Sequence, residues 1–199
     1  MAEPNQQALA EARQYGGTLT SSELLRIIEH HHRSDGRGLD RETLAAYDRA
    51  VAEDDSLPFK EGQLRSSIED TLSTGEGWHD AEAYYRVGDD RVSLFPQRWH
   101  DRLGDSDDVR EYVAVIEDDT ASTDTEPDAP KGGIGTGVPE PLLLDAISVI
   151  DGADRDTAKD RLERHRRDGG LVQDADQHPE ARVYLTEETS EMRDDWLDY

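Results

Sequence analysis

The sequence contains no cysteine and little of several other residue types, with only two methionines and two phenylalanines among its 199 residues. The absence of cysteine excludes disulfide bonds, thiol nucleophiles and thiolate metal sites. No stretch approaches the ~20 apolar residues of a membrane-spanning helix, and residues 1–17 lack the basic and apolar regions of a signal peptide. A hydrophobic content of 34% supports one ordinary domain or two small ones. We therefore expect a cytoplasmic protein that does not enter a membrane.

Positive charge is also scarce. The chain has 22 Lys and Arg, of which only three are Lys, against 47 Asp and Glu, and its formal net charge is -25. Such an acid-rich, Lys-poor composition resembles that of cytosolic proteins from extreme halophiles. In molar salt the Debye length shrinks to about 3 Å, so the self-repulsion of such a surface is largely screened. The negative net charge therefore does not exclude a nucleic-acid partner.

Composition divides the chain into two predicted units. Residues 117–138 are rich in Asp, Glu, Thr, Pro and Gly, and they bury too little apolar surface to offset their ordering entropy, which predicts a disordered acidic linker. Residues 1–17 are predicted to be a flexible N-terminus, although part of them could form a frayed helix. The two predicted units are therefore residues 18–116 and residues 139–199.

The first unit is predicted to be three helices followed by a β-hairpin. Thr20 with Glu23, and Asp40 alone, provide N-terminal capping signals for the first two helices. The apolar faces of the three helices are formed by Leu24, Ile27, Ile28 and His31, by Leu44, Tyr47 and Val51, and by Leu64, Ile68 and Leu72. Residues 83–95 alternate around a Gly-Asp-Asp turn, as a hairpin does. The sequence does not decide between helix and strand for residues 105–117.

The second unit is predicted to contain helices and a second hairpin. Leu143, Ala146, Ile147 and Ile150 lie on one face of a helix. Another helix precedes Gly169 and Gly170, and residues 171–186 are predicted to be strand, loop and strand. The first unit has the same order: a helix, then a glycine followed by a predicted strand that begins at Trp78, and then a hairpin. The two units are therefore interpreted as repeats of one fold.

The second unit resembles the winged helix-turn-helix superfamily, especially the MarR-like and ArsR-like transcriptional regulators. The matching residues are Thr157, Ala158, Arg161, Leu162, Gly170, Leu171, Val172, Val183, Leu185 and Thr186. His165 departs from the pattern, because Leu is commoner at that position. The resemblance covers about residues 139–186, and the first unit matches by element order only. It implies an α+β fold, mainly α, of two tandem winged helix-turn-helix units, each with three helices and a β-hairpin wing.

This resemblance implies a DNA-binding surface. In such domains the third helix lies in the major groove and the wing contacts the DNA backbone. With Ala158, Leu162 and His165 facing inward, the residues predicted to contact DNA are Thr157, Lys159, Arg161, Arg164 and Arg167, with Arg182 on the wing strand. Residues 154–168 hold six basic and five acidic residues, a local excess of positive charge in an acidic chain.

The same charges also permit a purely structural interpretation. The acidic side chains of the helix can pair with its basic ones at intervals of three or four residues, which would give only a solvated, salt-bridged helix. The pairs would join Asp156, Asp160 and Glu163 to Lys159, Arg164 and Arg167. The acidic linker could also fold onto the basic helix as a DNA mimic. These alternatives remain open from the sequence.

The expected function is that of a DNA-binding transcriptional regulator whose partner is double-stranded DNA. The alternative is a protein–protein adaptor with tandem winged-helix domains in a chromosome-maintenance, replication or defence complex. The first unit could then form a homodimer or bind a protein partner. No nucleophile motif appears, so no enzyme and no cofactor are expected. Adjacent histidines such as His30, His31 and His32 point in different directions on a helix, so no metal site is expected.

Overall fold

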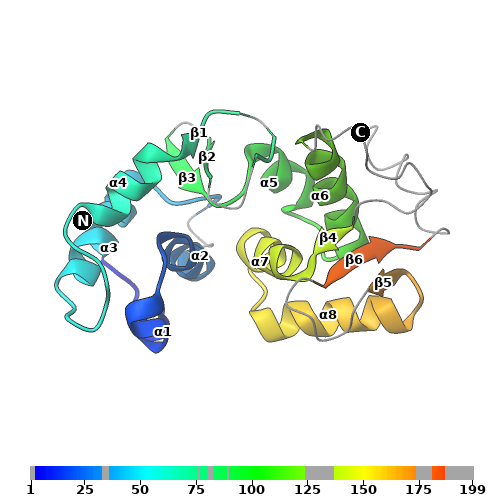
Figure 1. Ribbon diagram of the computed structural model, residues 1–199, viewed down its shortest axis with the longest axis horizontal. Coiled ribbons are helices and arrows are strands. Elements are labelled where there is room, and N and C mark those ends of the chain that lie inside the picture. Colours follow the sequence, from blue (N-terminus) through cyan, green and yellow to red (C-terminus); the bar gives the residue numbers. More distant parts are fainter. Residues whose placement is uncertain are drawn as a thin grey trace. The chain divides into compact units, whose positions relative to one another are not determined.

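The computed structural model (Figure 1) describes residues 3–32, 36–75, 77–79, 83–88, 90–123, 137–173 and 181–186. Its fold is α+β and mainly helical, with two sheets of three short strands each, which confirms the predicted class at that level. The chain divides into two compact units. We call Met1–Glu76 with Asp80–Gln97 the N-terminal unit, and Gly77–His79 with Arg98–Tyr199 the C-terminal unit.

The α-helices of the N-terminal unit are α1 (Gln6–Tyr15), α2 (Ser21–His32), α3 (Arg41–Ala52) and α4 (Gln63–Asp70). Two of these helices, α2 and α3, begin where the capping signals predict. Thr20 and Glu23 form a reciprocal capping box at α2, and Asp40 accepts the Thr43 N–H at 2.8 Å to cap α3. Asp48, buried on α3, caps α4 instead, because it accepts the N–H groups of Gly62 and Leu64.

Helix α1 differs from the flexible N-terminus predicted for residues 1–17. Ala8, Leu9 and Ala12 are buried because they share one helical face, and α1 packs against α2. The Asn5 side chain caps the helix, and the Asn5 N–H donates to the Tyr47 hydroxyl at 2.8 Å. The apolar face is short, which is why composition alone did not reveal it.

The predicted hairpin of the N-terminal unit is present. Strands β2 (Tyr84–Val87) and β3 (Arg91–Ser93) pair antiparallel, and β1 (Leu72–Ser73) pairs parallel to β2. Leu39, between α2 and α3, bridges to Val92 of β3. Two expectations fail here: Leu72 lies in β1 rather than in the third helix, and Trp78 begins no strand.

The C-terminal unit contains the remaining elements. They are α5 (Gln97–Leu103), whose first residue belongs to the other unit, then α6 (Val109–Thr123), β4 (Val138–Pro139), α7 (Glu140–Ile150), α8 (Arg155–Arg167), β5 (Leu171–Gln173) and β6 (Arg182–Leu185). The sheet order is β4-β6-β5, with both pairs antiparallel. The segment that the sequence left undecided, residues 105–117, is therefore helical from Val109 onward.

Helix α6 changes the predicted boundary between the units. The acidic linker was placed at residues 117–138, but its first seven residues continue α6, and Glu117 and Asp119 are buried. Asp119 is buried because it accepts the indole N–H of Trp99 at 2.6 Å and pairs with Arg98. Residues 124–136 lie outside the described residues. The acidic segment thus follows α6 within the C-terminal unit and does not separate the two units.

Gly137 directly precedes β4, the first strand of the C-terminal sheet. Its N–H donates to Glu117 at 3.2 Å, and its φ is 67°, in the region that favours glycine. A Cβ at this position would lie 2.4 Å from the ring of Tyr184, so only glycine fits beside that ring. This contact fixes the start of β4 against β6.

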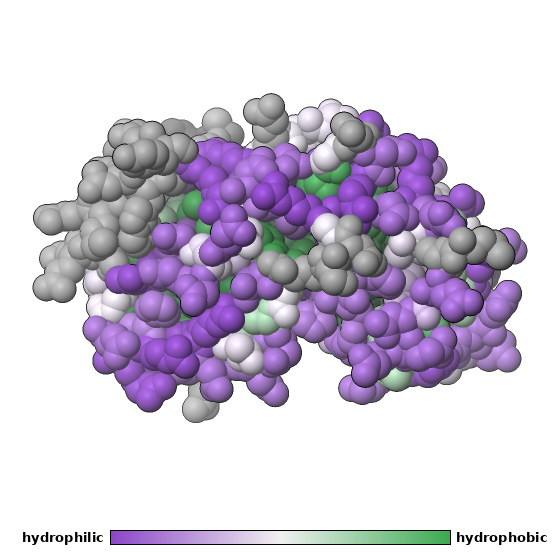
Figure 2. All heavy atoms as spheres, turned by 180° about the vertical axis from the view of Figure 1, so that it is seen from behind, coloured by the Kyte–Doolittle hydropathy of each residue, from purple (hydrophilic) through white to green (hydrophobic). Residues whose placement is uncertain are grey.

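The surface of the described residues is mostly polar. Hydrophilic residues dominate the face shown in Figure 2, and Val172 of β5 is the one large apolar side chain that is exposed among the described residues, at 49%. Within the same residues, no helix combines the length and the apolar character needed to cross a bilayer.

Candidate nucleic-acid interface

Helix α8 carries five of the six residues predicted to contact DNA, and it is bound to the rest of the unit by a narrow face. Only Ala158 and Leu162 of its residues are buried, and α8 packs against α7, β5 and α6. His165, also predicted inward, is partly buried. The other side chains of α8 are exposed or partly buried, as the sequence predicts.

Thr157 serves as part of the helix cap. Asp154 precedes α8 and accepts both the Thr157 N–H and the Thr157 hydroxyl at 2.8 Å. These hydrogen bonds hold the pKa of Asp154 below its ordinary value. The hydroxyl of Thr157 is therefore already used, and the structure assigns it to the start of the helix rather than to the outward face.

Lys159 and Arg161 are paired with carboxylates of their own unit. Lys159 contacts Glu140 at the start of α7 and lies 3.6 Å from Glu163. Arg161 pairs with Asp151, which follows α7, at 2.7 Å. Surface pairs of this kind contribute only about 0–1 kcal/mol to stability, yet they cancel the charge that the two side chains would offer to a phosphate.

Arg164 and Arg167 differ from these two residues, because no described carboxylate pairs with them. Both are exposed and lie three residues apart, on the last turns of α8. No ion-pair or hydrogen-bond partner of the Arg164 guanidinium lies among the described residues, and Arg167 donates only to the Glu163 carbonyl, at 3.2 Å. We call Arg164 and Arg167 the cationic turn.

Arg182 lies on β6, not on α8, and it is exposed. It is in register with Pro139 of β4, and its guanidinium donates to the Gly137 carbonyl at 3.1 Å. The wing loop between β5 and β6, residues 174–180, lies outside the described residues. The wing contact predicted for Arg182 stays a prediction.

The N-terminal half of α8 exposes negative charge. Asp156 and Asp160 are exposed and have no ion-pair partner within the described part of the chain, and Arg155 beside them pairs with Asp145 of α7. The salt-bridged interpretation is thus met in part: Glu163 pairs with Lys159 and Arg166 within the helix. The pairs expected for Asp156 and Asp160 are absent.

The carboxylates that pair with the cations of α8 were not predicted from the sequence. These residues are Glu140, Asp145 and Asp151. They belong to α7 or directly follow it, so they reach α8 only because the two helices are neighbours in space. A signal was available, because α7 was predicted correctly and its polar positions must lie beside its apolar stripe.

His165 contacts a small charged cluster instead of a DNA-facing surface. Its Nε2 lies 3.7 Å from Asp108, which also accepts a hydrogen bond from the Arg110 guanidinium at 2.9 Å. Burial raises the pKa of Asp108, but the hydrogen bonds from Arg110 and the charges of Arg110 and His165 outweigh it and hold that pKa below its ordinary value. The cluster connects α8 to the start of α6.

The histidine run of α2 does not form a ligand set. His31 lies 3.0 Å from Glu11, whereas His32 lies 3.0 Å from the Tyr47 hydroxyl. Their partners differ because adjacent residues on a helix point in different directions. In the part of the chain that the structure describes, no group of three or more histidine or acidic side chains could hold a metal ion.

No protein-family model matches this chain, and neither the curated proteins nor the solved structures gave a significant match.

Proposed function

We propose that this protein is a DNA-binding regulator of transcription that acts through a winged helix-turn-helix in its C-terminal unit. The element order α6, β4, α7, α8, β5, β6, with β6 between β4 and β5, supports this proposal. It gives three helices and a hairpin, with α8 in the position of the recognition helix. The N-terminal unit supports tandem units in the same way, because Leu39 bridges to β3 ahead of α3, α4 and the hairpin.

The observation that carries the proposal is the cationic turn. Arg164 and Arg167 are exposed and unpaired with any described carboxylate in a chain of formal net charge -25. Guanidinium groups bind phosphate oxygens in a bidentate manner, and such contacts supply much of the affinity of proteins for duplex DNA. The last turns of α8 are therefore the proposed phosphate-contacting surface.

The proposed contact set is smaller than the one expected from the sequence. Thr157, Lys159 and Arg161 already have partners, and the exposed Asp156 and Asp160 would repel phosphates from the N-terminal half of α8. Because base contacts usually come from the N-terminal residues of a recognition helix, we expect contact mainly with the DNA backbone and only modest sequence discrimination.

Replacing the cationic turn is expected to weaken DNA binding. In the double variant Arg164→Gln with Arg167→Gln, affinity for fluorescein-labelled duplex fragments should fall about tenfold or more, because two phosphate contacts are lost. Fluorescence anisotropy at fixed salt measures this. The matched control is Arg155→Gln, which removes an exposed arginine of the same helix that is already paired with Asp145, and it should change affinity by less than about twofold. Equal affinities of wild type and double variant would remove the proposal.

A protein–protein adaptor is the second candidate. The exposed Asp156 and Asp160, together with the neutralised cations beside them, favour it, because this half of α8 suits a basic protein surface better than a phosphate backbone. If neither wild type nor variant binds duplex DNA in the experiment above, the adaptor becomes the better account of this helix.

A further inference from the structure

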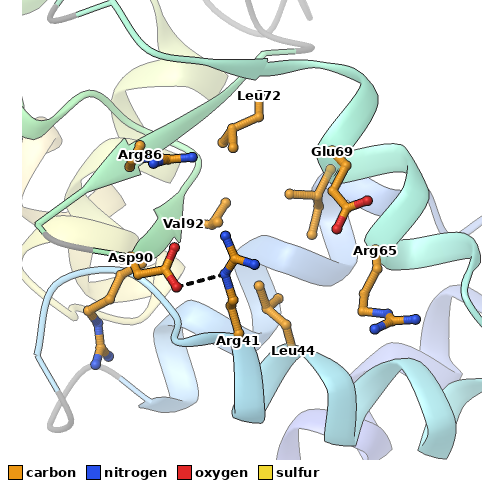
Figure 3. Close-up of a pocket in the computed structure, with 10 residues that line it drawn as sticks. Arg41, Leu44, Arg65, Glu69, Leu72, Arg86, Asp90 and Val92 are labelled. Atoms are coloured by element: carbon orange, nitrogen blue, oxygen red, sulfur yellow. Dashed lines mark ion pairs between the residues drawn. The ribbon is translucent and has the colours of Figure 1, made fainter.

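A hollow in the N-terminal unit carries a second, independent site. It lies where α3, α4 and the β1-β2-β3 sheet meet, and its cavity volume is about 110 Å³ (Figure 3). All the residues that line it belong to this one unit.

The inner part of the hollow is aliphatic. Leu44 of α3, Ile68 of α4, Leu72 of β1 and Val92 of β3 line it, and Figure 3 shows Leu44, Leu72 and Val92 around one common space. Leu44, Ile68 and Val92 are at most 8% exposed, so they form a packed surface rather than loose side chains. No aromatic residue is among those that line the hollow.

The rim of the hollow is cationic. Arg41, Arg65, Arg86 and Arg91 line it together with Glu69 and Asp90. Among the described residues, these four positive and two negative groups leave a formal excess of two positive charges, in a chain whose formal net charge is -25. Figure 3 shows Arg86 on one side of the hollow and Arg65 with Glu69 on the opposite side.

Three of the four arginines can accept a new partner. The Arg86 guanidinium has no partner among the described residues, and Arg41 pairs with Asp90 through side chains that are 70% and 55% exposed. Arg65 lies 3.9 Å from Asp48, which already accepts backbone N–H groups. Arg91 differs, because its guanidinium is held at 2.7 Å by the carbonyls of Arg37 and Gly38.

We propose that this hollow binds an acidic peptide segment of a partner protein. One large apolar side chain of that segment fills the aliphatic part, and carboxylates on either side of it pair with Arg86 and Arg65. Guanidinium groups bind carboxylates in a bidentate manner, and the two arginines lie on opposite sides of the apolar space. Charge complementarity favours this occupant, because the described residues of the rim carry an excess of positive charge that the carboxylates of an acidic segment can neutralise.

A nucleic-acid strand fits this hollow less well than a peptide does. Bases bind single-strand sites mainly by stacking on aromatic side chains, and the hollow offers aliphatic ones. The site also lies apart from the cationic turn in sequence and unit. It therefore goes beyond the proposed DNA contact, and it does not depend on it.

The test uses the full-length protein and a fluorescein-labelled peptide with one leucine flanked on each side by two glutamates. We expect saturable binding, which Arg86→Gln weakens about tenfold by removing a carboxylate contact. Because the Arg86 guanidinium has no described partner, this variant should keep the fold. Arg49→Gln is the matched control: Arg49 is exposed in the same unit, outside the hollow, and bonds only to its own helix. It should leave affinity unchanged.

Altered peptides and two other kinds of ligand test whether the occupant is an acidic peptide. A peptide with alanine for the leucine, or with glutamines for the glutamates, should bind much more weakly than the original. The proposal is overturned if the original peptide does not bind, or if Arg86→Gln leaves its affinity unchanged. It is also overturned if a short-chain aliphatic acid or a single-stranded oligonucleotide binds in an Arg86-dependent manner and the peptide does not.

Discussion

Replacing Asp119 with alanine is expected to destabilise the C-terminal unit by about 3 kcal/mol, because it removes the acceptor of a buried indole N–H and one of the two carboxylates that pair with Arg98. Asp119 is 4% exposed, accepts the Trp99 indole N–H at 2.6 Å and pairs with Arg98. Trp99 is fully buried and stacks on Trp78, with ring centroids 5.1 Å apart. Urea unfolding at fixed salt, followed by tryptophan fluorescence and circular dichroism, measures the effect.

The neighbouring Asp118 provides the matched control. It also pairs with Arg98, at 3.0 Å, but its side chain is 39% exposed, so Asp118→Ala should cost less than about 1 kcal/mol. If Asp119→Ala is as harmless as Asp118→Ala, then residues 117–123 are not an integral part of the unit. The acidic segment would then begin where the sequence alone placed it.

The second large effect concerns Glu29, which is buried in α2 and accepts the Leu94 N–H at 2.9 Å. Burial raises the pKa of Glu29 to about 7, although the hydrogen bonds from Leu94 and Ser93 and the charge of Arg91 oppose this. Between the ordinary pKa and the raised one, the folded state binds the proton more tightly than the unfolded state does. The contribution of Glu29 to stability is therefore lost as the pH rises through this window.

Glu29→Gln should remove this loss of stability at rising pH, because a glutamine side chain does not titrate. Relative to wild type, the variant should become more stable by roughly 3 kcal/mol between pH ~4.5 and pH ~8. Unfolding free energies measured for both proteins across this range test it, because the other carboxylates cancel in the difference. Glu53→Gln, an exposed change in the same unit, should give a difference that does not vary with pH. A constant difference for Glu29→Gln as well would show that Glu29 is not the buried titrating group.

Elements with local signals were predictable from the sequence. The capping groups Thr20 and Asp40 act within three residues of themselves, and the hairpin follows from the alternation of apolar residues over 83–95. The continuation of α6 was not predictable in this way. Its acidic end is ordered by Trp99 and Arg98, some 20 residues earlier, and composition carries no record of such a contact.

The candidate site was also predictable where local signals decide, and not where distant contacts decide. Helical periodicity correctly placed Ala158 and Leu162 inward, and hence the cations outward. Which cations remain available depends on α7, because Glu140 and Asp145 reach Lys159 and Arg155 across the helix pair. The arginine-lined hollow was missed because Arg41, Arg65 and Arg86 come from three different elements, and no spacing in the sequence relates them.

The dependence of DNA affinity on salt tests the central claim most directly, because each phosphate contact contributes about 0.9 to the slope of log affinity against log salt concentration. For wild type, the slope should be clearly negative. For Arg164→Gln with Arg167→Gln, it should be shallower by about 2. Identical slopes for the two proteins would show that the last turns of α8 touch no phosphate, and would contradict the proposed interface.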